Sequence, residues 1–403
     1  MKNNKKEKGN FPILRFKEFQ GEWEIVKLKN IVQKVSEKNK ENKIDIVFSN
    51  SATKGIVLQT EYFDKNIANK DNLCGYYIVI PNDFVYNPRI SSNAEVGAMS
   101  VNHTELTGLV SPLYTVFRII NVDIDTLFLE YIFKSKVWHN YMRSIASYGA
   151  RDDRMNVKDV AFFDLPLCMP LIREQRKIAS LLFLIDERIQ AQSKIIEDLR
   201  LLKSVLLKKA FFQELRFPQF NENWKTIRLG DIGTFFSGGT PLTSMEWYYN
   251  GDIPFIKSGE INADCTEQFI SEEGLKNSSA KMIEIGDLIY ALYGATSGEV
   301  GISKIKGAIN QAVLCIRTKL NSIFLLNYLM FKKAEILRTY LQGGQGNLSA
   351  EIIKSLRIPV PINAEQTKLA YLFSAFDKKV ELEMNIMAKL KQQKQYLLQQ
   401  MFI

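Results

Sequence analysis

The sequence predicts an α+β protein in which two pseudo-repeated α/β modules are separated by two long helices packed as an antiparallel coiled coil. Two observations support this fold class. The first is an internal repeat that divides the 403 residues into two similar halves. The second is a long heptad pattern at the end of each half, which is typical of paired helices. A period of about 200 residues excludes a solenoid of many short units.

The repeat is anchored at three places in each half. The first anchor is Leu14-Arg15-Phe16 with Trp23, which recurs 201 positions later as Leu215-Arg216-Phe217 with Trp224. The others are Asp83 with Glu95-Val96-Gly97, which recur 204 positions later, and Glu174-Gln175, which recurs 191 positions later. The falling offset means that the second half is shorter. Between the anchors the two halves share few residues. The anchors form a repeated frame, and the residues between them differ in the two halves.

Each half ends in a stretch that follows a proline and contains no Pro or Gly, so it can form one long helix. Apolar positions alternate steps of four and three, which is the heptad seam of a coiled coil. The first seam is Ile178, Leu182, Ile185, Ile189, Ile196, Leu199 and Leu206, interrupted by Gln192 and Lys203. The second is Leu369, Phe373, Phe376, Val380, Met387, Leu390 and Leu397, interrupted by Glu383 and Lys394.

These matching interruptions indicate that the two helices pack on each other, because a buried polar residue fixes the register of a coiled coil. Antiparallel pairing within the chain would place the modules at opposite ends of a rod of roughly 60 Å, at about 1.5 Å per residue. The alternative is that the heptads mediate homodimerisation. We favour pairing within the chain because one chain holds two equivalent seams.

The predicted boundaries are a basic tail at 1–10, a first module at 11–171, a first helix at 172–212, a second module at 213–362 and a second helix at 363–403. Each module combines strand-like runs with one helix. The first has predicted strands at 44–49, 76–80, 84–86 and 114–120 and a helix over 126–147. The second has predicted strands at 253–257, 288–292 and 312–317 and a helix over 323–341.

The composition of the chain indicates the kind of molecule it binds and the compartment in which it works. The formal net charge of +9 suits a polyanion such as nucleic acid, because Lys and Arg that neutralise phosphates release counterions. The cysteines Cys74, Cys168, Cys265 and Cys315 are widely spaced and predict neither a disulfide framework nor a zinc site. A charged start and the lack of an apolar run of about 18 residues predict neither a signal peptide nor a membrane span. We therefore expect a cytoplasmic protein of a bacterium or archaeon.

Candidate nucleic-acid contacts lie where glycine, small polar and basic residues gather in predicted loops. Backbone amides, Lys and Arg meet phosphates, while Arg, Asn and Gln read base edges. In the first module the candidates are Lys54, Arg89, Asn93, Arg151 and Arg154. In the second they are Thr240, Lys257, Ser258, Tyr293, Gln345 and Asn347. The alternative for each loop is an ordinary turn.

The sequence contains no recognisable catalytic or metal-binding pattern. The two histidines, His103 and His139, belong to no nucleophile or zinc motif. Gly238-Gly239-Thr240 lacks the Gly-Lys-Ser/Thr of a phosphate loop. Asn87-Pro88-Arg89 lacks the second proline and the aromatic residue of the adenine methyltransferase motif. We therefore expect neither catalytic residues nor a metal site, and no cofactor bound by this chain.

The chain resembles, over nearly its entire length, the specificity subunit of type I restriction-modification systems. The residues that carry the resemblance are the two Leu-Arg-Phe and Trp anchors, Ser237-Gly238-Gly239-Thr240-Pro241, Pro170 with Glu174-Gln175, and Pro361 with Glu365-Gln366. The resemblance implies that each module is a target recognition domain for double-stranded DNA and that the helices set the gap in a split, asymmetric site. It also implies that the chain itself performs no chemistry. Since the first module lacks the Gly-Gly-Thr-Pro turn, the two modules are expected to read different bases.

The resemblance further implies four partner subunits. Two would be methyltransferases that carry S-adenosylmethionine and methylate adenine. Two would be translocase and nuclease subunits that use ATP and Mg²⁺. Two other interpretations stay open: a coiled-coil scaffold or adaptor without DNA specificity, and an enzyme of an unrecognised type that acts on nucleic acid.

Overall fold

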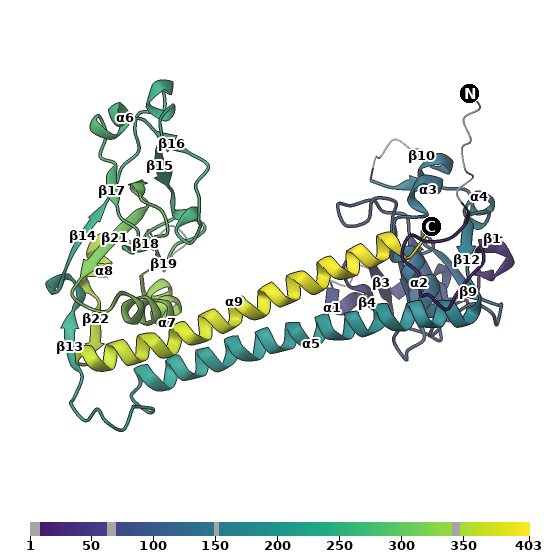
Figure 1. The fold of residues 1–403 in the computed structure, drawn as a ribbon, viewed down its shortest axis with the longest axis horizontal. Coiled ribbons are helices and arrows are strands. Elements are labelled where there is room, and N and C mark those ends of the chain that lie inside the picture. Colours follow the sequence, from purple (N-terminus) through teal and green to yellow (C-terminus); the bar gives the residue numbers. More distant parts are fainter. Residues whose placement is uncertain (1–8, 63–69, 149–152, 341–346) are drawn as a thin grey trace. The chain divides into compact units, whose positions relative to one another are not determined.

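The computed structural model describes residues 9–62, 70–148, 153–340 and 347–403 (Figure 1). The chain forms two compact units, the first from residues 1–191 with 386–403 and the second from residues 192–385. Each unit holds one module and part of both long helices, α5 (Ile172–Phe211) and α9 (Asn363–Gln400). None of the described helices combines the length and apolar character that crossing a membrane requires.

Module 1, which precedes α5, is built on a four-stranded antiparallel sheet. The strand order is β2 (Val32–Val35), β9 (Thr115–Ile119), β6 (Phe84–Asn87) and β7 (Ala98–Val101). Further antiparallel pairs join β1 (Glu24–Lys27) to β12 (Pro166–Met169), β3 (Phe48–Ser51) to β4 (Gly55–Leu58), β5 (Tyr77–Val79) to β8 (Gly108–Val110), and β10 (Ser147–Tyr148) to β11 (Met155–Asn156). Its helices include α1 (Gln59–Tyr62), α2 (Thr126–Lys134), α3 (His139–Ile145) and α4 (Asp159–Phe163).

Module 2, between α5 and α9, repeats this plan. Its antiparallel sheet has the order β14 (Gly233–Ser237), β21 (Val313–Thr318), β18 (Leu288–Ala291) and β19 (Val300–Ile302). A second sheet has the order β16 (Phe269–Ile270), β15 (Ile253–Ile256), β20 (Gly307–Ile309) and β17 (Lys281–Ile283), and β13 (Lys225–Arg228) pairs with β22 (Arg357–Val360). Its helices include α6 (Glu272–Lys276), α7 (Ser322–Tyr340) and α8 (Ala350–Ser355).

The predicted repeat is therefore a repeat of structure, and its anchor residues are clamps between each module and its long helix. Arg15 donates two hydrogen bonds of 2.7 Å to the buried carboxylate of Glu174 in the first turn of α5. Arg216 makes the equivalent contacts, at 3.0 and 2.8 Å, with Glu365 of α9. Such two-pronged contacts fix orientation as well as distance, which explains why the motif occurs in both halves.

The ends of the long helices complete the module cores. In the first unit Phe402, just after α9, packs on Phe128 of α2 at a centroid distance of 5.4 Å. In the second unit Phe211, at the end of α5, packs on Phe324 of α7 at 5.7 Å. Phe211 and Phe402 are 191 positions apart, the same offset as the heptad seams. Each module core therefore contains aromatic area supplied from the end of a long helix.

The antiparallel packing predicted from the heptads is confirmed within the units. In the second unit the side chain of Gln192 donates to the carboxylate of Glu383, and Lys203 donates to Asp377 at 2.6 Å. As the residue number increases along α5, the number of the partner on α9 decreases, so the two helices run in opposite directions. The two matching polar interruptions at the middle of the seams are thus bonded to each other. The seam positions listed above are buried or half-buried throughout.

One predicted element was wrong. The single helix expected over 126–147 is two helices, α2 and α3, separated at residues 135–138. Ser135 adopts an extended conformation and donates its hydroxyl to the carbonyl of Ile132 at 2.6 Å, which ends α2. The indole of Trp138 donates to the carbonyl of Phe133 at 3.0 Å and stabilises the break. The predicted helix over 323–341 is present as α7, and the strand predicted at 44–49 lies slightly later, as β3.

Candidate nucleic-acid interface

In module 1 the loop after β6 lies beside the segment that leads into β11. Arg89 and Arg154 face each other across an antiparallel bridge, although they are 65 positions apart in the sequence. Backbone hydrogen bonds of 2.9 and 3.0 Å, one on each side of the pair, hold this bridge. Both side chains are exposed. The structure therefore brings together two of the predicted contact residues.

The arginine pair borders a hollow of about 480 Å³ whose lining also includes Tyr76, Asn87 and Tyr114. Burial raises the pKa of Tyr114, although the Asn50 backbone and the two arginines lower it in part. The Tyr114 hydroxyl therefore stays protonated at neutral pH and can donate a hydrogen bond. Planar cations, aromatic rings and amides are the groups that contact phosphates, bases and base edges.

A buried asparagine in β3 positions the walls of this hollow. The side-chain amide of Asn50 donates to the carbonyls of Val85 at 2.7 Å and Ala98 at 3.0 Å, and its oxygen accepts from the Ser100 hydroxyl at 2.7 Å. The Asn50 carbonyl accepts from the Asn87 side chain at 3.1 Å. A buried amide with its hydrogen bonds satisfied holds its neighbours rigidly. Sequence reasoning selected the surrounding loop but missed Asn50, whose signal was a lone amide in a strand-like run.

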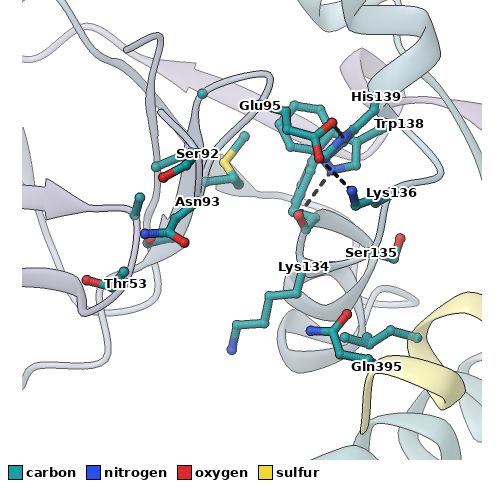
Figure 2. Close-up of a pocket in the computed structure, with 18 of the residues that line it drawn as sticks. Thr53, Ser92, Asn93, Glu95, Lys134, Ser135, Lys136, Trp138, His139 and Gln395 are labelled. Atoms are coloured by element: carbon teal, nitrogen blue, oxygen red, sulfur yellow. Dashed lines mark hydrogen bonds and ion pairs between the residues drawn. The ribbon is translucent and has the colours of Figure 1, made fainter. Parts of the chain in front are cut away.

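The other described candidates of module 1 lie nearby in the fold. Lys54 is exposed in the turn between β3 and β4, and Asn93 is exposed in the loop between β6 and β7. Asn93 lines a second hollow, of about 510 Å³, where Figure 2 shows it beside Ser92 and opposite Lys134. Arg151 lies outside the described residues.

A carboxylate fastens the β6–β7 loop to the helical part of module 1. Glu95 accepts from Lys136 at 2.5 Å and also pairs with Arg143 of α3, as Figure 2 shows in part. The hydrogen bond from Lys136 lowers the pKa of Glu95 most, with smaller contributions from His139 and Arg143. Module 2 has the equivalent ion pair between Glu299 and Lys333. The loop that carries Arg89 is thus anchored at its far end.

In module 2 the candidates gather at one edge of the second sheet. Strands β15 and β20 are parallel, so the loops that follow them start side by side. Lys257-Ser258 follows β15, and the amide of Asn310, after β20, donates to the carbonyl of Ile256 at 3.3 Å. Thr240 donates its hydroxyl to the side chain of Gln311 at 2.5 Å. Two predicted loops and Gln311 therefore form one polar edge.

The remaining described candidates join this edge through backbone bonds. The amide of Leu292 donates to the carbonyl of Ala312 at 2.8 Å, and the amide of Leu348 donates to the carbonyl of Leu292 at 3.1 Å. The second bond joins the segment that contains Tyr293 to the segment that contains Asn347. Burial raises the pKa of Tyr293, so its hydroxyl also stays neutral. Gln345 lies outside the described residues.

The same backbone bond recurs in the two modules. The residue before Tyr293 is bonded to the residue after Asn347, just as the residue before Arg89 is bonded to the residue after Arg154. Tyr293 stands 204 positions after Arg89, the offset of the neighbouring anchors, and so takes the place of Arg89 in module 2. At the offset of 191, Arg154 corresponds to Gln345, which lies outside the described residues. The frame is conserved between the modules and the chemistry presented on it is different.

Sequence reasoning also missed Tyr76 and Tyr114 in module 1 and Gln311 in module 2. Tyr114 is the first residue of the strand predicted at 114–120, and Gln311 directly precedes the strand predicted at 312–317. A polar or aromatic residue at a strand end was the available signal. Within the ranges that the structure covers, no three His, Cys, Asp or Glu side chains are grouped as metal ligands.

Comparison with known proteins agrees with this architecture. Residues 221–392 match the family model described as the type I restriction modification DNA specificity domain. The chain is 22% identical over 399 residues to the putative type I restriction enzyme MjaX specificity subunit of Methanocaldococcus jannaschii, covering 93% of this chain and 91% of that protein. It is 28% identical over 176 residues to the type I restriction enzyme EcoR124I/EcoR124II specificity subunit of Escherichia coli, covering 41% and 43% of the two chains.

Solved structures share the fold. The type I restriction-modification S subunit from M. genitalium superposes with a TM-score of 0.59 at 17% identity, covering 98% of this chain and 99% of that one. A chain from a structure of the type I restriction-modification system superposes with a TM-score of 0.62 at 18% identity, covering 93% and 96%. Residues 221–392 therefore contain a type I restriction modification DNA specificity domain, and the whole chain has the fold of type I restriction-modification specificity subunits and is similar to them in sequence.

Proposed function

We propose that this subunit binds a split, asymmetric site on double-stranded DNA, with one module reading each half and the long helices setting the gap between the halves. One observation carries the proposal. The modules present different residues on the same frame, since Arg89, bridged to Arg154 in module 1, is replaced by Tyr293 in module 2. The backbone of DNA is the same at both half-sites, so two modules with one frame can contact it in the same way. Different residues on that frame can then contact different bases in the two half-sites.

The reaction chemistry belongs to partner subunits in this proposal. Two methyltransferases would supply S-adenosylmethionine and methylate adenine, and two translocase and nuclease subunits would use ATP with Mg²⁺. This chain would contribute binding and orientation alone, in the cytoplasm where the DNA is. The polar edges of the modules carry donors and cations suited to DNA, among them Arg89, Lys257 and Thr240.

The test is to co-express the chain with its methyltransferase in a methylation-free host and to map methylated adenines by long-read sequencing. We expect a split, asymmetric motif that appears only when this chain is present. An unmarked genome from a pair that co-purifies would contradict recognition while leaving assembly intact.

A second candidate function is a coiled-coil adaptor without DNA specificity. It is favoured by large apolar residues exposed on α5, among them Leu184, Leu201 and Leu202. In the proposed function these side chains are available to a partner subunit. Failure to co-purify with the methyltransferase, together with no preference for duplex DNA, would favour the adaptor.

Lys257 gives a direct prediction for the DNA contact. Lys257→Ala should weaken binding of the assembled complex and reduce the slope of log affinity against log salt by about 1, because one phosphate contact is lost. The matched control is Lys276→Ala. Lys276 is exposed on α6 after β16, at the opposite end of β15 from Lys257. Equal affinities at several salt concentrations for Lys257→Ala and wild type would show that this loop is not a contact.

A further inference from the structure

The arginine pair of module 1 places like charges close together. Because the flanking residues make the backbone hydrogen bonds, Arg89 and Arg154 form a non-hydrogen-bonded pair of an antiparallel ladder. In such a pair the side chains leave the same face and start closest together. Like charges opposite each other are unfavourable unless another group compensates them. The bridge therefore places two arginine side chains on the same face at the edge of the hollow.

Local carboxylates compensate this pair weakly. Arg89 lies 3.9 Å from Asp153, at the long end of the ion-pair range, and within the described part of the chain Arg154 has no ion pair. Other arginines of module 1 are different. Arg15, Arg118 and Arg143 each reach a carboxylate oxygen at 2.7 Å or less. The pair is thus left with donors available to a ligand.

Hydrogen bonds hold the backbone beneath Arg89 before a ligand arrives. The amide of Arg89 donates to the Asn87 side chain at 3.1 Å, and Asn87 is bonded to the buried Asn50. The loop is also fastened by Glu95 and its ion pairs. A side chain that must select one base needs a backbone whose position is fixed before binding.

Resting on the proposed function, we propose that Arg89 and Arg154 are the specificity-determining pair of module 1 and that they select a guanine in its half-site. Guanine presents two acceptors, O6 and N7, in the major groove, and arginine is the side chain that most often binds both. Tyr76 and Tyr114, in the lining of the same hollow, supply further contact area beside the pair.

A phosphate ligand fits these observations less well than a base. Phosphate contacts do not depend on sequence, so they belong to the frame that both modules share. The pair does not belong to that frame, because module 2 has Tyr293 at the position of Arg89 and Gln345 at the position of Arg154 in the repeat. Both residues of module 1 are also arginine rather than lysine, and the planar fork of arginine is what two-acceptor recognition requires.

The experiment uses the full chain in complex with its methyltransferase. Methylation mapping with the wild type defines both half-sites, and the absence of a split motif at that step would contradict the proposed function itself. Duplexes with the mapped site are then made with each guanine replaced in turn by 7-deazaguanine, which lacks the N7 acceptor. Affinity is measured for wild type, Arg89→Ala, Arg154→Ala and the double variant Arg89→Lys with Arg154→Lys.

We expect one guanine in one half-site at which 7-deazaguanine weakens wild-type binding at least about fivefold. The alanine variants should bind the normal site more weakly and show no further loss at that guanine. The double lysine variant should lose the same discrimination while keeping the wild-type salt dependence. Tyr293→Ala, in module 2, should remain sensitive at that guanine.

Two outcomes would overturn the inference. In the first outcome, every 7-deazaguanine replacement weakens the alanine variants by the same factor as the wild type, so no guanine depends on either arginine. In the second, the alanine variants weaken binding to all sites alike and reduce the salt slope by about 1 each, which is the behaviour of phosphate contacts. A urea unfolding transition that matches the wild type shows in each case that the variant is folded.

Discussion

Removing seven residues from each long helix is expected to shorten the gap between the two half-sites by about three base pairs and to leave the bases of both half-sites unchanged. The deletions are 193–199 in α5 and 376–382 in α9, which are matched on either side of the bonded pair Gln192 and Glu383. Seven residues are one heptad, so the seams stay in register. At about 1.5 Å per residue they span roughly 10 Å, and a base pair spans about 3.4 Å.

The measurement is methylation mapping with the deleted chain and its methyltransferase. A control that deletes 193–199 alone should also change the gap, but with lower stability, because the partners of the remaining seam residues shift by one heptad. Changed bases in either half-site, with an unchanged gap, would disprove the assignment of spacing to the helices and of reading to the modules.

Loss of the Arg15 clamp is expected to give the largest change in stability. Arg15→Ala leaves the Glu174 carboxylate, which is 1% exposed, without its cation. Breaking a buried pair from one side costs about 3 kcal/mol or more, because the remaining charge stays desolvated. The start of α5 compensates only in part through its backbone amides.

The repeat supplies a matched comparison in Arg216→Ala. There Glu365 keeps a hydrogen bond from the indole of Trp224 at 3.1 Å, whereas the indole nitrogen of Trp23 in module 1 is buried without a described partner. We therefore expect a smaller loss, of about 2 kcal/mol. Urea unfolding of the full chain, followed by tryptophan fluorescence, measures both. Equal losses, or a larger loss for Arg216→Ala, would show that the indole does not support the carboxylate.

The sequence alone identified the features that repeat or that follow a short period. The offsets of 201, 204 and 191 aligned the anchors, and the alternation of four and three steps identified both helices and their seams. The bonded Gln192 and Glu383 follow from the same alignment. These features are readable because the period of a helix is local and a duplicated frame aligns with itself. The helix over 126–147 was wrong because the Ser135 hydroxyl and the Trp138 indole bond to carbonyls of the last turn of α2, and an apolar pattern does not record such side-chain bonds.

The tertiary structure decided which polar residues meet. The composition of the loops selected Arg89 and Arg154 separately, but only the bridge between the loops made them a pair. The role of Asn50 in positioning the hollow was also invisible, since its four partners come from other strands. Contacts of this kind join residues that are far apart in the chain. They are fixed by strand pairing and by the need of buried polar groups for hydrogen-bond partners, and neither leaves a regular spacing in the sequence.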